Sequence, residues 1–357
     1  MNLEALRKRI DELDRELVGL LNERTRCALE IGRIKREQGD EVYAPSRERE
    51  VLRRVESFSK GPLPVESLHA IYREIMSAAI ALERPVRIAY LGPPATFTHQ
   101  AARARFGASV AYEPCDTISD VFAVVTKRAC DYGVVPIENS TEGAVTHTLD
   151  EFVETPLKIC AEIYLPIAHH LLSRSPREAI RRLYSNPQVF GQCRRWLQEH
   201  MPGVELVPVS STAQAAILAA KEPGTGALAG RLAAELYQLD ILEEDIQDLG
   251  GNTTRFLVIG QRFGPPSGED RSSVVFGVRH KVGALYEALA SFSRHGINLC
   301  KIESRPSRTK AWEYLFFVDF EGHVEDEPVR RALEALRDHC TVLKVLGSYP
   351  RAGGRAE

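Results

Sequence analysis

A single arginine interrupts the apolar stripe of the first predicted helix. Near the N-terminus, apolar residues recur at alternating steps of four and three, the spacing of a long helix that packs against other helices. The stripe consists of Leu6, Ile10, Leu13, Leu17, Leu20, Cys27, Ile31 and Ile34. Arg24 stands where one apolar residue is missing. Because a buried charge without a partner is costly, Arg24 predicts an anion beside it.

Two further cations can be placed relative to Arg24 by helix geometry. Lys35 follows it by 11 residues, which returns the side chain to within about 20° around the helix and roughly 16 Å along it. Both side chains could converge on one small ligand, or both could extend to solvent at the edge of a helix pair, and spacing alone leaves both readings open. Arg7 precedes Arg24 by 17 residues, about 25 Å along the axis and about 100° around it. One helix therefore cannot bring both arginines to one small molecule.

The segments that must hold these residues differ in periodicity. Residues 1–84 are predicted to be all-helical, with a shorter helix after Ser46 as N-cap and a third helix after Pro64. From Pro85 to about residue 260, short β-branched runs alternate with Ala-rich helical stretches, as in an α/β domain. After the linker GPPSGED, residues 272–350 predict the order βαββαβ of a small ferredoxin-like sandwich.

Composition allows several functions in one chain. At 357 residues the chain exceeds the size at which single cores stop growing, about 250 residues. The 46 Lys plus Arg against 49 Asp plus Glu give a net charge of −3, which indicates neither a nucleic-acid nor a membrane partner. Seven scattered cysteines without a CxxC pair argue against disulfides and zinc, and for a reducing compartment. With no signal peptide or membrane-spanning stretch in the sequence, we expect a cytoplasmic protein.

Neither the histidines nor the glycines of the sequence indicate a metal site, a cofactor-binding loop or a histidine that acts as a catalytic base. His169 and His170 are adjacent on a predicted strand, so their side chains should point to opposite faces, and HExxH spacing does not occur. Neither GPPATF nor GGNTTRF has the glycine spacing of a Walker loop or a dinucleotide-binding loop. We therefore expect no metal and no cofactor.

The N-terminal segment resembles the all-helical chorismate mutase family. The words LRKRIDELD, LLNERTRCALEIGRIK and SRERE, followed by a third helix ending IALE, match the family in order and spacing. The resemblance implies a mutase domain at residues 1–85 and an intertwined dimer in which each active site borrows an arginine from the partner chain. The positions that match its substrate-binding residues are Arg7, Arg24, Lys35, Arg47, Glu48 and Glu83. Ala44 and Ala79 stand where many members of the family have Asp and Ser. We therefore expect weaker substrate binding, in a mutase site that is still active.

The reaction that this resemblance implies needs preorganisation. Rearrangement of chorismate to prephenate is pericyclic, and it requires neither a nucleophile nor a metal. Cations can hold the two carboxylates in a compact geometry, while Lys35 and a donor at Glu83 stabilise charge on the breaking ether oxygen. Glu48 would accept a hydrogen bond from the ring hydroxyl.

Five words of the second segment resemble prephenate dehydratase, in order, over residues 86–262. They are YLGPPATFTHQAA, VVPIENSTEGAVTHTLD, SNPQVFGQC, GALAG and GGNTTRFLVIG. Each word alone has a plain structural alternative, since GNTTRF is also typical of a turn that leads into a strand. The set implies a two-lobed α/β fold like that of periplasmic binding proteins, with the active site between the lobes.

Dehydration of prephenate expels CO₂ and the ring hydroxyl while the ring becomes aromatic. The enzyme must mainly hydrogen-bond the leaving hydroxyl and anchor two carboxylates. The resemblance implies that Thr254 donates to that hydroxyl and that Asn139 and Gln192 orient the substrate. Supporting candidates are Glu138, Ser185 and Arg255.

Two words of the third segment resemble the phenylalanine-contacting words of ACT regulatory domains. They are HKVGALYEAL and INLCKIESRP, and they imply effector contacts at Gly283, Ala284, Leu285, Glu303 and Ser304. A glycine that opens a helix lets a carboxylate approach backbone N–H groups, and Glu303 could accept from an ammonium group. The alternative is a helix start and a strand end without a ligand. Tyr286 replaces a smaller apolar residue that is common in the family.

The three resemblances predict a bifunctional enzyme of phenylalanine biosynthesis. It would convert chorismate through prephenate to phenylpyruvate, be inhibited by L-phenylalanine, and form a homodimer or a higher homo-oligomer. One alternative is a monofunctional dehydratase whose helices only dimerise, and the set Arg7, Arg24, Lys35 and Glu48 argues against it. Another is a phenylalanine sensor without catalysis, which Thr254 argues against.

Overall fold

The computed structural model describes residues 2–38, 45–307 and 313–352. The chain divides into two compact units, residues 1–86 with 105–111, and residues 87–104 with 112 onward. The first unit is helical and the second contains three sheets. None of the helices in the described ranges has both the length and the apolar character needed to cross a membrane.

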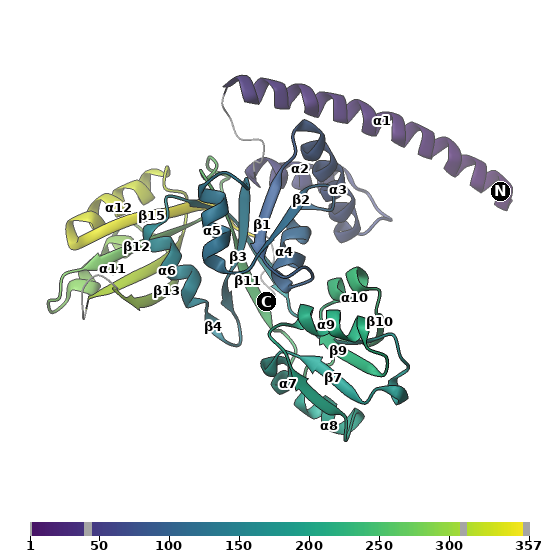
Figure 1. Cartoon of the computed structure of the whole chain (residues 1–357). Helices are drawn as coiled ribbons and strands as arrows, with labels where there is room; N and C mark the ends of the chain where they lie inside the picture. The colour runs from purple at the N-terminus through teal and green to yellow at the C-terminus, as the bar shows by residue number, and fades with distance from the viewer. Residues whose placement is uncertain (1, 39–44, 308–312, 353–357) are drawn as a thin grey trace. The chain divides into compact units, whose positions relative to one another are not determined.

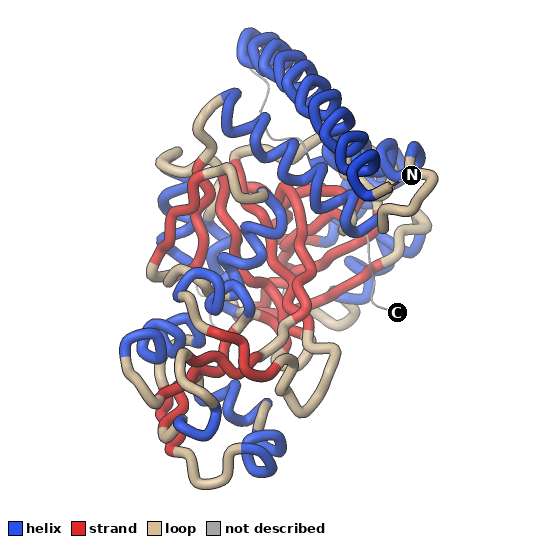
Figure 2. The backbone as a smooth tube through the Cα atoms, turned by 90° about the vertical axis from the view of Figure 1, so that its right-hand side faces the viewer, coloured by secondary structure: helices blue, strands red, loops and turns tan. Residues whose placement is uncertain are grey.

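Within the described ranges, the N-terminal unit is built on three helices. They are α1 (Leu3–Gln38), α2 (Pro45–Phe58) and α3 (Val65–Glu83), and Figure 2 shows α1 as one long, uninterrupted helix. The all-helical prediction is confirmed, and α3 follows Pro64 as expected. The predicted N-cap role of Ser46 is wrong, because α2 already begins at Pro45. The fixed φ angle of proline suits the first helical position, where no N–H partner is needed.

The apolar stripe of α1 is exposed within a single chain. Leu17 is 54% exposed and Leu20 is 63% exposed, and the other leucines and isoleucines of the stripe are exposed as well. Gly32, toward the end of the helix, is buried. A Cβ on Gly32 would lie 2.0 Å from the Cδ of Glu83, so α1 and α3 touch closely at this point.

The first lobe of the second unit is a sheet of six strands. Its order is β2-β1-β3-β11-β5, and a short β4 pairs with β3. The strands are β1 (Arg87–Leu91), β2 (Ala111–Cys115), β3 (Tyr132–Asn139), β4 (Gly143–Ala144), β5 (Lys158–Pro166) and β11 (Thr253–Gly260). The helices of this part of the chain are α4 (Phe97–Phe106), α5 (Ile118–Thr126) and α6 (Thr146–Glu154). β11 lies antiparallel between β3 and β5.

The second lobe is a sheet of five strands in the order β10-β6-β9-β7-β8. The strands are β6 (His170–Ser173), β7 (Arg182–Ser185), β8 (Glu205–Pro208), β9 (Thr225–Ala229) and β10 (Asp240–Glu243). Its helices are α7 (Pro187–Gln192), α8 (Arg194–His200), α9 (Thr212–Lys221) and α10 (Arg231–Tyr237), grouped together in Figure 1. The chain enters this lobe after β5 and leaves it before β11. The two-lobed α/β prediction is confirmed.

The third sheet has four strands in the order β13-β14-β12-β15, and the predicted βαββαβ order is confirmed. Its elements are β12 (Asp270–Val278), α11 (Ala284–Arg294), β13 (Leu299–Pro306), β14 (Tyr314–Glu321), α12 (Glu327–His339) and β15 (Cys340–Pro350). Alternate residues of β12 face opposite ways. Phe276 packs in a core with α11 and α12, whereas Val275 packs in the core of the first lobe. The third sheet and the first lobe therefore share a core.

Candidate functional sites

Thr254 and Asn139 face each other on neighbouring strands. Thr254 lies at the start of β11 and pairs in register with Asn139 at the end of β3. The Asn139 Nδ2 donates hydrogen bonds to Thr254 Oγ1 and to Asn252 Oδ1, each at 2.8 Å. The structure thus brings together two predicted catalytic residues. Sequence reasoning missed Asn252, although it lies in the GGNTTRF word.

Gln192 reaches the same region from the end of α7 in the second lobe. Its Oε1 lies 2.9 Å from the Nε2 of His169, and its Nε2 lies 3.4 Å from the Oε1 of Glu142. Glu142 follows Asn139 in the chain, so this bond connects the two lobes. We call the group Asn139, Glu142, His169, Gln192 and Thr254 the lobe junction.

His169 supports Gln192 from a buried position. Burial lowers the pKa of the His169 imidazole, and the hydrogen bond with Gln192 opposes this shift in part. A neutral ring with its proton on Nε2 would donate to Gln192 Oε1 and hold the amide in one orientation. His170, by contrast, accepts from the backbone N–H of Asp245 through Nδ1.

Ser185 forms its side-chain hydrogen bond within the second lobe. Its side chain is fully buried, and its Oγ donates to the backbone carbonyl of Leu228 at 2.8 Å. Its hydroxyl thus connects β7 to the end of β9. This hydrogen bond gives Ser185 a structural setting, and its contact with substrate stays a prediction.

Arg255 and Glu138 form ion pairs with residues other than the predicted catalytic pair. The guanidinium of Arg255 is buried and binds Glu162 and Asp319, and Glu138 forms an ion pair with Lys301 at 2.8 Å. These partners belong to β5 and the third sheet. The sequence could not distinguish this placement from a substrate contact, because both need the same charged residues.

The mutase candidates lie on all three helices of the first unit. Arg24 and Lys35 are half-buried, and Arg7 is exposed. Arg47 is largely exposed and pairs with Glu50, while Glu48 pairs with Arg105 at 2.7 Å. Burial raises the pKa of Glu48, and the charges of Arg105 and Arg73 offset part of that shift. Ala79 is buried, and Ala44 lies outside the described residues.

Glu83 at the end of α3 packs directly over Gly32 of α1. The 2.0 Å approach to an added Cβ shows that only glycine leaves room for the carboxyl group in this position. Lys35 lies three residues further along α1. Sequence reasoning missed Gly32, and a glycine inside a strong helical pattern is the signal that could have found it.

The predicted effector residues lie at one end of the third sheet. Gly283 precedes α11 with a φ of 79°, a conformation that favours glycine, and an added Cβ there would meet no atom within 4 Å. Ala284 and Leu285 begin α11, with Ala284 buried. Glu303 and Ser304 lie near the end of β13, a strand at the edge of the sheet.

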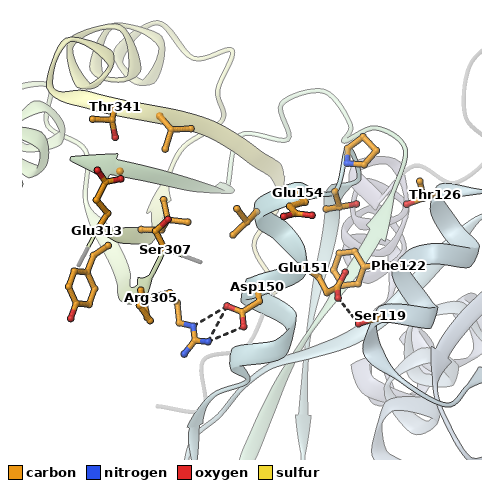
Figure 3. Close-up of a pocket in the computed structure, with 18 of the residues that line it drawn as sticks. Ser119, Phe122, Thr126, Asp150, Glu151, Glu154, Arg305, Ser307, Glu313 and Thr341 are labelled. Atoms are coloured by element: carbon orange, nitrogen blue, oxygen red, sulfur yellow. Dashed lines mark hydrogen bonds and ion pairs between the residues drawn. The ribbon is translucent and has the colours of Figure 1, made fainter. Parts of the chain in front are cut away.

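A cavity of about 780 Å³ lies elsewhere, between α5 and α6 of the first lobe and the third sheet. Figure 3 shows Asp150 and Arg305 bonded to each other at this cavity. None of the predicted catalytic or effector residues lines it. Within the described residues, no cluster of three or more His, Cys, Asp or Glu side chains could hold a metal ion.

Models of three known families match the chain in order. The chorismate mutase type II model matches residues 6–84, the prephenate dehydratase model residues 88–263, and the ACT domain model residues 272–338. A bifunctional chorismate mutase/prephenate dehydratase of Aquifex aeolicus (strain VF5) is 50% identical over 355 residues, which cover 98% of each chain.

The chain belongs to the bifunctional chorismate mutase/prephenate dehydratase family. The predicted family and the order of its domains are therefore confirmed.

Solved structures resemble the chain over about three quarters of its length. The prephenate dehydratase of Arthrobacter aurescens in complex with L-Phe is 35% identical, with a TM-score of 0.69, over 76% of this chain and 91% of that one. GqqA, described as a novel type of quorum quenching acylase, is 30% identical, with a TM-score of 0.69, over 75% of this chain and 98% of that one. This fold therefore occurs in proteins described by different activities, whereas the match over the full chain is to a bifunctional mutase/dehydratase.

Proposed function

We propose that each chain carries two active sites and one regulatory site. Residues 1–85 rearrange chorismate to prephenate, residues 86–262 convert prephenate to phenylpyruvate, and residues 272–350 bind L-phenylalanine, which inhibits the enzyme. Membership of the bifunctional family supports both reactions, and the L-Phe complex of the Arthrobacter aurescens relative supports the regulator.

The dehydratase assignment rests on the direction of the hydrogen bond between Asn139 and Thr254. Asn139 Oδ1 accepts from the backbone N–H groups of Thr141 and Glu142. The amide Nδ2 must therefore face Thr254, where it donates to Oγ1 at 2.8 Å. Because that oxygen already accepts from Asn139, the hydroxyl hydrogen of Thr254 is available to donate to another group. We assign it to the departing hydroxyl of prephenate.

The reaction then needs little further chemistry from the protein. As the ring carboxylate leaves as CO₂, its bonding electron pair enters the ring and the carbon–oxygen bond to the hydroxyl breaks. The hydroxyl takes up a proton from solvent and departs as water. A hydrogen bond from Thr254 stabilises the charge that develops on this oxygen, and Gln192 orients a carboxylate of the substrate from the second lobe.

A second copy of this chain is the partner that the exposed stripe of α1 fits. An apolar stripe with a period of 3.5 residues along a helix is suited to packing against other helices. Within one chain the stripe is exposed. The separation of Arg7 from Arg24 also requires that one of them act in a site formed with another chain. We therefore assign a homodimer in which Arg7 serves the partner's mutase site.

Within the mutase site, Lys35 and Glu83 act on the breaking ether oxygen. The close packing of Glu83 on Gly32 places it on the α1 surface that precedes Lys35 by one turn. Arg24 and Arg47 bind the carboxylates, and Glu48 accepts from the ring hydroxyl. Glu48 also forms an ion pair with Arg105 at 2.7 Å.

The regulatory site uses the open backbone at Gly283 and the acidic side chain of Glu303. Ala284 and Leu285 begin the helix over which the effector carboxylate would lie, and Ser304 adds a hydroxyl.

A cytoplasmic location agrees with the absence of disulfides among the seven cysteines, all of which lie in the described ranges.

Supplying chorismate alone tests the proposed function. The purified parent should consume chorismate and release phenylpyruvate, and L-phenylalanine should slow the second step. Thr254→Ala should lower phenylpyruvate formation at least about 100-fold, because a hydrogen-bond donor to developing charge is lost. Chorismate should still become prephenate at the parent rate.

Two results would contradict this proposal. Loss of both activities in a folded Thr254→Ala protein would exclude separate sites. A parent protein that consumes chorismate but leaves added prephenate unchanged would support a mutase without a dehydratase.

A further inference from the structure

Residues adjacent to the catalytic pair face the opposite side of the first-lobe sheet. Arg255 follows Thr254, Glu138 precedes Asn139, and Arg255 and Glu138 pair in register, as Thr254 and Asn139 do. Successive side chains of a strand point to opposite faces. The lobe junction is therefore built on one face of β3 and β11, and Arg255 and Glu138 lie on the other.

Arg255 is held from three directions. Its Nη1 donates to Asp319 Oδ2 at 2.6 Å, its Nη2 to Tyr349 Oη at 2.9 Å, and its Nε to Glu162 Oε2 at 3.0 Å. The side chain is only 5% exposed. Removing one partner of such a buried charge is strongly unfavourable, so the guanidinium has little freedom to move.

Further ion pairs extend this group. Arg271 Nη1 donates to the same oxygen of Glu162 at 2.6 Å, and Lys301 Nζ lies 2.8 Å from Glu138 Oε2. The three cations Arg255, Arg271 and Lys301 thus balance three carboxylates. We call the whole group the buried ionic network, and it comprises Glu138, Glu162, Arg255, Arg271, Lys301, Asp319 and Tyr349.

Every strand of the third sheet contributes to this network. Arg271 comes from β12, Lys301 from β13, Asp319 from β14 and Tyr349 from β15. The third sheet thereby binds the two strands of the first lobe at the residues next to the catalytic pair. The regulatory domain is in direct contact with the backbone segments that present Thr254 and Asn139.

We propose that Arg255 and Glu138 are positioning residues through which the ACT domain sets the geometry of Thr254 and Asn139. The inference rests on the proposed dehydratase function and adds a role for residues that do not touch the substrate. The start of β11 and the end of β3 are each held by a side chain in the buried ionic network. Because misplacement of a catalytic group by about 1 Å can cost about 100-fold in rate, loss of an anchor should slow the chemistry.

A simpler account is that the network only attaches the ACT domain. The ion pair between Arg305 of β13 and Asp150 of α6 distinguishes the two accounts. It also joins the third sheet to the first lobe, at 2.9 Å, and its Asp150 side chain is 14% exposed, close to the 13% of Asp319 (Figure 3). Neither residue is adjacent to Asn139 or Thr254 in sequence.

The test compares Asp319→Asn with the matched control Asp150→Asn in the full-length protein. Asp319→Asn should lower kcat for prephenate at least about tenfold while KM changes less than about twofold, because Asp319 touches Arg255 and not the substrate. Asp150→Asn should keep kcat within about twofold of the parent. Asp319→Glu, which retains the charge, should recover part of the lost kcat. Equal losses of kcat in both Asn variants, or a main effect on KM, would overturn the inference.

A milder variant decides the question if Asp319→Asn does not fold. Tyr349→Phe removes only a hydroxyl that contacts Arg255 and Ser273. It should lower kcat about twofold to fivefold at unchanged KM. A parent-like kcat in a folded Tyr349→Phe protein would overturn the inference. Failure of the parent to convert prephenate would instead contradict the proposed function, so the two outcomes are distinct.

Discussion

At the scale of single residues, two neighbours on one strand have different roles. Thr254 presents a hydroxyl whose oxygen accepts from Asn139, which directs its proton elsewhere. Arg255, one residue later, has its charge satisfied by Asp319 and Glu162. The polarity of the hydrogen bonds separates the two roles, because a hydroxyl can still donate while this guanidinium is committed to its carboxylates.

Asp319 should make the stability of the second unit depend on pH. Burial by itself raises the pKa of Asp319, but the Arg255 guanidinium and the Ser273 hydroxyl outweigh it and hold this pKa below the usual value of 3.8. A carboxyl with a lower pKa in the folded state stabilises the fold above about pH 4, and this contribution is lost as pH falls through the folded-state pKa.

Urea unfolding at pH 7 and pH 3 measures this contribution. Asp319→Asn should lower the unfolding midpoint more at pH 7 than at pH 3, because the parent has lost part of its advantage in acid. The difference in unfolding midpoint between the parent and Asp319→Asn should therefore be smaller at pH 3 than at pH 7. A difference that is equal or larger at pH 3 would contradict the assignment.

At the scale of elements, the packing of two helices determines where the carboxyl group of Glu83, a proposed mutase residue, lies. Glu83 ends α3 and lies over Gly32 of α1, where an added Cβ would come within 2.0 Å of its Cδ and Oε1. The atoms that would have to move belong to the flexible end of Glu83. A methyl group at position 32 would thus displace the carboxyl group without breaking the helix.

Gly32→Ala should therefore lower mutase activity at least about tenfold by displacing Glu83. Dehydratase activity should remain at the parent level, and helix propensity should rise, because alanine is favoured over glycine inside a helix by about 1 kcal/mol. Gly19→Ala is the matched control on the same helix, since an added Cβ there meets no atom within 4 Å. Chorismate consumption and thermal unfolding check both variants, and parent-like mutase activity in Gly32→Ala would remove Gly32 from the site.

At the scale of the whole molecule, the two activities belong to different compact units. The proposed dehydratase residues and the buried ionic network lie in the second unit, within one chain. The proposed mutase residues lie in the first unit, whose long helix leaves an apolar stripe exposed. Dehydratase variants should therefore spare the mutase, while mutase activity should depend on chain association.

Mixed dimers test this dependence. Arg7→Ala and Arg24→Ala should each be inactive as mutases when expressed alone, because every site then lacks one arginine. After the two variants are unfolded and refolded together, hybrid dimers should regain up to about half of the parent activity per dimer, since one of the two sites then contains both arginines. Tagged protomers verify that hybrids form. Inactive hybrids would show that the mutase site is not shared.

The sequence by itself determined the elements and the order of the domains. Helical periodicity and helix-start signals predicted the three N-terminal helices, and alternating short strands and helices predicted the α/β and βαββαβ segments. These patterns are local, because a few residues already show the period of a helix or a strand. The words around Thr254 and Asn139 likewise predicted a pair that the fold brings within hydrogen-bonding distance.

Only the tertiary structure decided which neighbours face the lobe junction and which face the ACT domain. A strand pattern shows that Thr254 and Arg255 point to opposite sides, but it cannot show what covers each side. For Arg255 that depends on Asp319, 64 residues away in the chain, and for Glu83 it depends on Gly32 in another helix. Contacts between distant segments arise from packing of whole elements, and the local periodicity of one segment carries no information about its packing partner.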